Sequence, residues 1–355
     1  MTTFSMPSRA PRVPAPIKTR TMTCYYDYDL ATPTTRPDVV NTASWSPPST
    51  PSSSDSTAAS PPAHGAPPTA FSHHHPVPRS IPPPPSQRVA EVRQVWHENF
   101  TDEAALIDAL LPKYRYAAID TEFPGTVYRP SVPAYLLTPE KRYALLKANV
   151  DALHLIQLGL TLFNSDPTSP PPITWEFTFR EFDPAHDPHA ADSIALLRAA
   201  GVDFARAARH GVHASAFGPR LRRWLMRAPA AGLVTFAGGR DVAHLIKAAF
   251  GSGYRLPASA PELEAVAAAM LRRRPVFDVK EMAQRCGPRA GDLRGGLDCV
   301  AAKLGVARDV GVAHRAGADS LLTCRAFLRM KELYFDDDDK LGSVAGLLTD
   351  ITTSF

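Results

Sequence analysis

The sequence lacks several features that mark common classes of protein. Only four of its 355 residues are cysteine, and no two of them form a Cys-x-x-Cys pair. This argues against a zinc site and favours free thiols in a reducing compartment. No apolar run approaches the about 18 residues of a membrane-spanning helix, and the N-terminus has no apolar signal core. We therefore expect no membrane segment.

An excess of charge of one sign is also missing once the N-terminal region is set apart. The whole chain carries 39 Lys and Arg and 35 Asp and Glu. Residues 1–88 hold seven of the basic and four of the acidic side chains, so residues 89–355 have a net charge of only +1. A nearly neutral domain argues against a broad basic face for duplex DNA, but leaves room for a local groove that binds a single strand.

The N-terminal region lacks the apolar residues that a core requires. It is rich in Pro, Ser, Thr and Ala, and just over half of the 36 prolines precede Val89. Such a segment cannot bury enough apolar surface to offset the entropy lost on ordering, so residues 1–88 are predicted to be disordered. At the other end, the acidic run 336–339 predicts a flexible tail over residues 336–355, because like charges repel. Residues 89–335 are then one folded domain.

This domain carries the pattern of a mixed sheet flanked by helices. Apolar runs and alternating segments bounded by turn residues predict strands, and capped amphipathic segments predict helices. The main expected strands cover 116–119, 155–163, 173–179 and 232–236, with shorter ones at 92–96 and 276–279, and the main expected helices cover 138–148, 239–250 and 316–334. The first three strands would form an antiparallel meander, because their connections include tight loops. Early strands followed by helices mixed with single strands indicate an α+β or mixed-sheet α/β domain.

Acidic residues lie at the ends of three of these elements. Asp120 and Glu122 follow the first strand, two positions apart, so their side chains share one face if the strand continues. Two carboxylates on one face repel each other and cost desolvation energy unless a cation lies between them. Hard divalent cations such as Mg²⁺ take oxygen ligands of this kind. Asp241 in the first turn of one helix and Asp319 at the start of the last helix are the matching acids.

His314 lies five residues before Asp319, so it can occupy a loop while the aspartate is fixed on the helix. That arrangement suits a mobile base beside a water molecule. Taken singly, each residue also has an ordinary explanation, since Asp241 could be a helix N-terminal acid favoured by the dipole and His314 a loop histidine. Asp278, after another short strand, ranks below the other acids.

The order Asp-x-Glu, then Asp, then His-x4-Asp is the signature of DEDDh 3′→5′ exonucleases, which have an RNase H-like fold. The phrases around these residues resemble one branch of that group, the Caf-one/Pop-two poly(A) ribonucleases, in a plant-like form. They include Asp120-Thr121-Glu122-Phe123-Pro124-Gly125, Ile156-Gln157-Leu158-Gly159-Leu160-Thr161 and Ala316-Gly317-Ala318-Asp319-Ser320-Leu321-Leu322-Thr323. The resemblance spans about residues 92–335.

The resemblance implies an enzyme that shortens mRNA poly(A) tails from the 3′ end and releases 5′-AMP by two-metal hydrolysis. Two divalent cations, Mg²⁺ or Mn²⁺, would be held by four acids: Asp120, Glu122, Asp241 and Asp319. His314 would be the general base. The implied partners are single-stranded poly(A) and subunits of the Ccr-four/Not complex, among them the Not-one scaffold and a Ccr-four-type deadenylase. The implied locations are the cytoplasm and the nucleus.

Two points stay open in the sequence. Phe123, beside the acids, could contact the terminal nucleotide or belong to the core. The family usually has Phe-His-Ser-Gly-Tyr-Asp before the third acid, where this chain has Phe236-Ala237-Gly238-Gly239-Arg240-Asp241. Arg240 could pair with Asp241 and weaken cation binding, or point outward at phosphate. The alternative to an active nuclease is therefore a weakly active or inactive scaffold subunit of the same complex.

Overall fold

The structure, a computed structural model, describes residues 91–133, 136–166, 168–227, 229, 231–286, 293–349 and 351. All of them fall within one compact unit of the chain. The predicted disorder of residues 1–88 lies outside these described residues. Within the described ranges, no helix is both long and apolar enough to cross a membrane.

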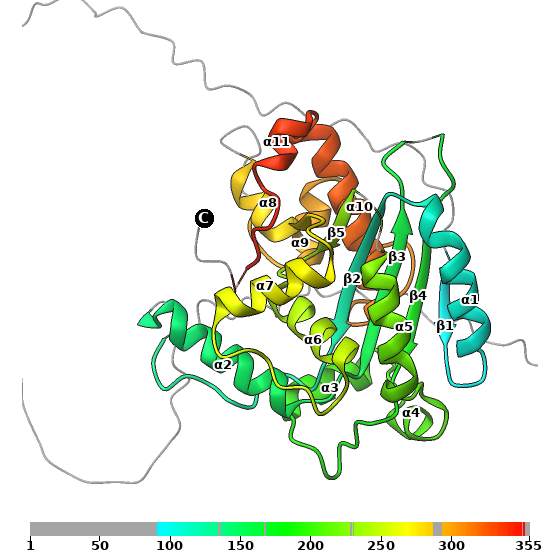
Figure 1. Cartoon of the computed structure of the whole chain (residues 1–355), viewed down its shortest axis with the longest axis vertical. Coiled ribbons are helices and arrows are strands. Elements are labelled where there is room, and N and C mark those ends of the chain that lie inside the picture. Colours follow the sequence, from blue (N-terminus) through cyan, green and yellow to red (C-terminus); the bar gives the residue numbers. More distant parts are fainter. Residues whose placement is uncertain are drawn as a thin grey trace, which may run out of the picture. The chain divides into compact units, whose positions relative to one another are not determined.

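The described residues contain one six-stranded sheet with helices on both faces (Figure 1). The strands are β1 (Val92–Val95), β2 (Tyr116–Glu122), β3 (Gln157–Phe163), β4 (Ile173–Thr178), β5 (Gly232–Thr235) and β6 (Val276–Asp278). The longer helices are α1 (Phe100–Leu110), α2 (Pro139–Ala152), α3 (Ala191–Ala199), α5 (Ala214–Met226), α6 (Gly239–Phe250), α7 (Ala260–Met270) and α10 (Ala316–Tyr334). The shorter ones are η1 (Leu111–Lys113), α4 (Phe204–His210), α8 (Val279–Arg285), α9 (Leu297–Lys303) and α11 (Asp338–Gly342).

The sheet is mixed, with the strand order β1-β4-β3-β2-β5-β6. Strands β2, β3 and β4 pair antiparallel, so the predicted meander is confirmed. β5 runs parallel to β2, β6 runs parallel to β5, and β1 runs parallel to β4. The predicted fold class, a mixed α/β sheet flanked by helices, is thereby confirmed, and β2 lies near its centre.

The alternation of side chains along β2 decides which layer each of its residues meets. Ile119 belongs to the apolar cluster that includes α5 and α6, whereas Ala118 belongs to the cluster that includes α10. In Figure 1, α5 and α6 lie in front of the sheet and α10 lies behind it. Successive strand residues point to opposite faces, so Asp120 and Glu122 face the α10 layer and Thr121 faces the α6 layer. Both acids lie within the strand rather than after it.

A glycine lets the N-terminus of α10 approach the sheet. Gly159 of β3 pairs directly with Asp120 of β2. A Cβ atom at Gly159 would lie only 1.9 Å from the carbonyl oxygen of Ala316, the first residue of α10. A backbone approach this close requires glycine. It places Asp319, in the first turn of α10, beside the acids of β2.

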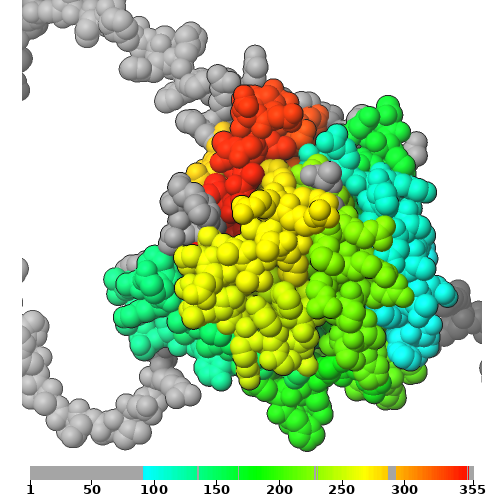
Figure 2. Space-filling view, viewed as in Figure 1, coloured from blue at the N-terminus to red at the C-terminus, as the bar shows by residue number. Residues whose placement is uncertain are grey.

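The C-terminal segment differs from the predicted flexible tail over residues 336–355. The acids of the run are exposed, but Asp337 caps α11 by accepting a hydrogen bond from the backbone N–H of Lys340 at 2.7 Å. The tail was predicted from the repulsion between like charges. Acids at a helix N-terminus are also stabilised by the helix dipole and by capping, and this opposes the repulsion. After α11, Leu348 and Ile351 are buried, and the backbone N–H of Gly346 donates to the carbonyl of Val276 in β6 at 2.8 Å. Figure 2 shows these red residues against the yellow and gold part of the chain.

Candidate active site

The two acids of β2 are crowded by other carboxylates. Glu122 is buried, with 7% of its surface exposed, and Asp120 is half-buried. Burial, and then the charges of Asp241, Asp319 and Glu122, raise the pKa of Asp120 well above its usual range. Burial, followed by the charges of Asp319 and Asp241, does the same to the pKa of Glu122. Their negative charges are therefore unfavourable in the protein without a neutralising cation.

Asp241 reaches this group from the opposite layer. It is buried in the first turn of α6, and its Oδ1 accepts hydrogen bonds from the backbone N–H of Thr121, at 3.1 Å, and from the Thr121 hydroxyl. Burial raises the pKa of Asp241 to about 7, although the Thr121 hydrogen bonds and the charge of Arg240 act in the other direction. Thr121, between the two acids of the Asp-x-Glu motif, thus fixes the third acid beside them.

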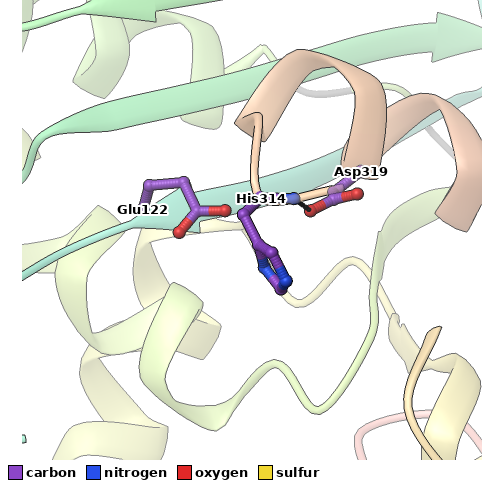
Figure 3. A group of neighbouring side chains, drawn as sticks. All are labelled: Glu122, His314 and Asp319. Carbon is purple, nitrogen blue, oxygen red and sulfur yellow. Dashed lines mark hydrogen bonds between the residues drawn. The ribbon is translucent and has the colours of Figure 1, made fainter. Parts of the chain in front are cut away.

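Asp319 is held by two contacts. Its Oδ2 accepts a hydrogen bond from the backbone N–H of His314 at 2.9 Å (Figure 3), and its Oδ1 forms an ion pair with Arg308 at 2.5 Å. Arg308 also binds both carboxylate oxygens of Asp298. Burial raises the pKa of Asp319 to about 6, against the opposing charge of Arg308. Arg308 is a site residue that the sequence did not indicate.

His314 lies between Glu122 and Asp319 in Figure 3. One ligand atom from each of the three residues lies within 4.8 Å of the others. The backbone of His314 has φ 65°, in the left-handed region that few residues other than glycine adopt, and this turn brings its N–H to Asp319. Burial lowers the pKa of the His314 imidazole, which favours the neutral form that can accept a proton.

Of the five residues predicted to form the site, Glu122, His314 and Asp319 have ligand atoms within 4.8 Å of one another. Asp120 and Asp241 lie outside that cluster but are close enough for their charges to act on it. Four carboxylates converge from β2, α6 and α10, and an imidazole adjoins two of them. This donor set fits divalent cations, because oxygen-rich sites with excess negative charge are what Mg²⁺ and Mn²⁺ bind. The unfavourable ionisation of these acids when no cation is bound points the same way.

Asp278, the weaker fifth candidate, is satisfied by protein donors instead. It is fully buried and accepts hydrogen bonds from the backbone N–H groups of Ala237 at 2.8 Å and of Gly238, Lys280 and Thr349 at 3.0 Å each. Ala237, at the position where the sequence departs from the family phrase, has φ 54°. Asp278 thus ties the turn before Asp241 to the C-terminal segment, which holds that turn in place despite the altered residues.

Phe123 follows the acids and is half-buried. Its ring stacks on the buried ring of His244 in α6, with the centroids 4.7 Å apart and the planes inclined by 19°. One face of Phe123 is therefore part of the protein interior. His244 was not among the predicted residues, and its spacing from Asp241 carries no signal that distinguishes it from a core histidine.

Comparisons with known proteins find relatives among ribonucleases. The model of the CAF1 family ribonuclease matches residues 95–215. The chain is 37% identical to the probable CCR4-associated factor 1 homolog 10 of Arabidopsis thaliana, over 69% of this chain and 87% of the relative. It is 32% identical to the poly(A) ribonuclease pop2 of Schizosaccharomyces pombe, over 74% and 76% of the two chains.

Solved structures of related ribonucleases have a similar fold. The Mg²⁺- and Mn²⁺-bound form of Pop2p from S. pombe matches with a TM-score of 0.63 and 31% identity, over 73% of this chain and 99% of that one. The RNase domain of the yeast Pop2 protein matches with a TM-score of 0.60 and 24% identity, over 76% and 99% of the two chains. The second likeness supports the fold alone.

Proposed function

This chain belongs to the CAF1 family of ribonucleases, and from that premise we propose that it is a divalent-cation-dependent 3′→5′ exoribonuclease that shortens poly(A) tails and releases 5′-AMP. The observation that carries the proposal is that Glu122, His314 and Asp319 have ligand atoms within 4.8 Å of one another, while the charges of Asp120 and Asp241 act on the same group. A relative of the same fold, 31% identical, has been solved with Mg²⁺ and Mn²⁺ bound, which supports a cation site of this composition.

The four acids would hold two cations, and bound divalent cations would supply the Lewis-acid chemistry that polarises a phosphoryl oxygen and stabilises the leaving oxygen. The protein itself positions the acidic side chains close to one another. Thr121 orients Asp241, and the N–H of His314 orients Asp319. Gly159 admits the N-terminus of α10 to the sheet.

His314 is proposed as the general base that accepts the proton of the attacking water. It lies on the turn before α10, with its ligand atom within 4.8 Å of those of Glu122 and Asp319. A histidine in such a position can take a proton near neutral pH and return it to solvent. Phe123 is proposed to contact the terminal nucleotide only with the part of its side chain that His244 leaves uncovered.

Assembly and location follow from the family and are proposals for this chain. Its relatives are named CCR4-associated factors and a poly(A) ribonuclease. We accordingly expect this chain to join subunits of the Ccr-four/Not complex, including the Not-one scaffold and a Ccr-four-type deadenylase, in the cytoplasm and nucleus. Its substrate would be single-stranded poly(A).

The test is incubation of the purified chain with a 5′-labelled RNA that ends in an oligo(A) tract, with Mg²⁺ or Mn²⁺. The expected result is a ladder that shortens from the 3′ end, 5′-AMP as the product, and no reaction of the Asp120→Asn variant. A second labelled RNA with a 3′ oligo(U) tract measures the preference for adenosine.

Equal inertness of the wild type and the variant would contradict the proposal, provided both show the same thermal unfolding. An inert protein that still binds Ccr-four/Not subunits would favour the scaffold alternative. That alternative is suggested by Ala237 and Arg240, which depart from the family phrase. A ladder on DNA as fast as on RNA would contradict the substrate class.

A further inference from the structure

A cavity lies beside the acids on the same face of the sheet. It has a volume of about 330 Å³ and is lined by residues of β1, β3, β4 and α4 and by Arg315, the neighbour of His314. Gln157 of β3, which lines it, pairs directly with Glu122 of β2, and Thr178 of β4 pairs with Gln157. Directly paired residues project to one face. The cavity therefore begins one strand away from the acids.

Gln157, one of the residues that line the cavity, carries a buried acceptor without a partner among the described residues. Gln157 is only 1% exposed, and its side-chain N–H groups donate to Glu176 Oε1 at 3.2 Å and to the Thr178 hydroxyl at 3.0 Å. These two bonds fix the orientation of the amide. The opposite atom, Oε1, accepts no hydrogen bond there. A buried carbonyl oxygen of this kind is costly unless a ligand or water supplies a donor.

The rim of the cavity carries an aromatic ring and two cations. The guanidinium of Arg206 lies over the ring of Trp96, 4.0 Å from its centroid. Arg315 is fixed by Glu176, by the carbonyl oxygen of Gly201 at 3.0 Å and by Gln94 Oε1 at 3.2 Å. Asp203 also lines the cavity and caps α4 through the backbone N–H of Arg206. Aromatic rings and arginines together are typical of surfaces on which nucleobases stack.

We propose that this cavity is a subsite for one nucleotide of the bound RNA strand, upstream of the linkage that is cleaved. The base contacts the Trp96–Arg206 pair, an amino group of the base donates to Gln157 Oε1, and Arg206 and Arg315 attract the phosphate. The exocyclic amino group of adenine is such a donor. A cavity of this volume lies within the range of small-ligand sites, about 300–1,000 Å³. The inference rests on the proposed function, because the acids define which end of the strand is bound.

The test is equilibrium binding of fluorescein-labelled oligo(A) to the full chain in an Asp120→Asn background, measured by fluorescence anisotropy. Trp96→Leu is expected to weaken binding roughly tenfold, the loss of about one stacked base. Arg206→Ala is expected to weaken it several-fold. Arg209→Ala is the matched control, since Arg209 is an exposed arginine of the same helix that does not line the cavity, and it should leave binding unchanged.

A second comparison isolates the role of Gln157. Oligo(A) should bind the parent chain more tightly than an oligomer of purine riboside, which lacks the amino group. Gln157→Met removes the acceptor at similar volume and should abolish that preference. If Gln157→Met fails to fold, the oligo(A) affinity of Arg206→Ala still tests the subsite, because Arg206 is exposed and its substitution should not disturb folding.

Unchanged oligo(A) affinity in both Trp96→Leu and Arg206→Ala would overturn the inference. So would free 5′-AMP that competes as well as oligo(A), because the cavity would then take a free nucleotide rather than a strand. Neither result depends on hydrolysis. A wild-type chain that binds oligo(A) through these residues but does not shorten it would instead contradict the proposed function.

Discussion

The end of β2 and the end of β6 both carry buried carboxylates, but the two regions satisfy them in opposite ways. At the end of β6, Asp278 accepts hydrogen bonds from four backbone N–H groups. At the end of β2, Asp120 and Glu122 meet Asp241 and Asp319, and each of these acids has its pKa raised first by burial. Burial alone therefore does not mark a functional acid.

The difference lies in what surrounds each carboxylate. Backbone N–H groups satisfy the carboxylate of Asp278. Through these hydrogen bonds Asp278 connects the turn at Ala237 to the C-terminal segment at Thr349. The acids at the end of β2 have carboxylates for neighbours, with Arg308 as a cation paired to Asp319. Such a group is stable in its ionised form only when cations join it. Substitutions in the two regions should therefore have opposite effects.

The largest effect is expected for Asp120→Asn. Removing one charge should abolish exonuclease activity to background, because cation binding is lost, yet it should raise the melting temperature measured in EDTA, because repulsion is relieved. Paired activity and thermal-unfolding measurements check this. A variant that loses activity and stability together would place Asp120 with Asp278 as a structural acid.

A second large effect is expected at His314. His314→Asn keeps a residue that tolerates the left-handed backbone conformation, and should reduce kcat by about 10²–10⁴-fold, the usual contribution of a general base. The stabilisation of the protein by Mg²⁺ should be largely retained. Loss of that stabilisation along with kcat would assign His314 to cation binding instead.

Without divalent cations, the raised pKa of Asp241 should make the free energy of unfolding depend on pH. Asp241 has its pKa raised from 3.8 to about 7, so the folded protein holds a proton that the unfolded chain has lost. The contribution of Asp241 to the free energy of unfolding in EDTA should accordingly be complete below about pH 4 and be lost as the pH rises from there to about 7, by at most about 4 kcal/mol. Urea unfolding of the wild type and of Asp241→Asn measures the difference. An identical pH dependence of the two proteins would contradict the account.

The smallest effect is expected at the end of β6, with the reverse pattern. Asp278→Asn should lower the free energy of unfolding by about 1–3 kcal/mol, because its buried backbone donors lose a charged acceptor. Below the melting transition, kcat should stay within a few-fold of the wild type. A variant of normal stability that no longer responds to Mg²⁺ would show that Asp278 belongs to the cation site.

The sequence predicted the mixed sheet, which is confirmed, and it indicated the acids as candidates, because both the strands and the acid spacing follow local rules. The apolar run at Tyr116–Ile119 and the spacing of Asp120 and Glu122 are sufficient to indicate a strand with two acids on one face. The positions of Asp241 and Asp319 at helix starts are local as well. The prediction that these acids lie close together required only their order along the chain and the family resemblance.

Contacts between distant segments were outside the reach of such rules. Nothing near Arg308 in the sequence indicates its ion pair with Asp319, and nothing near Asp278 indicates that it binds Thr349. The C-terminal segment was mispredicted because its acidic run hides the capped helix α11 and the apolar residues that follow. The sequence around Gly159 carries no sign of its close approach to Ala316, because that approach exists only when α10 lies on the sheet.

The central claim is that cations bind at the end of β2 and not at the end of β6. A crystal of the full chain grown with Mn²⁺ and measured at a wavelength where manganese scatters anomalously tests it directly. The account predicts anomalous peaks among Asp120, Glu122, Asp241 and Asp319, absent in crystals of Asp120→Asn. A map with no peak among these acids, or with a peak at Asp278, would contradict it.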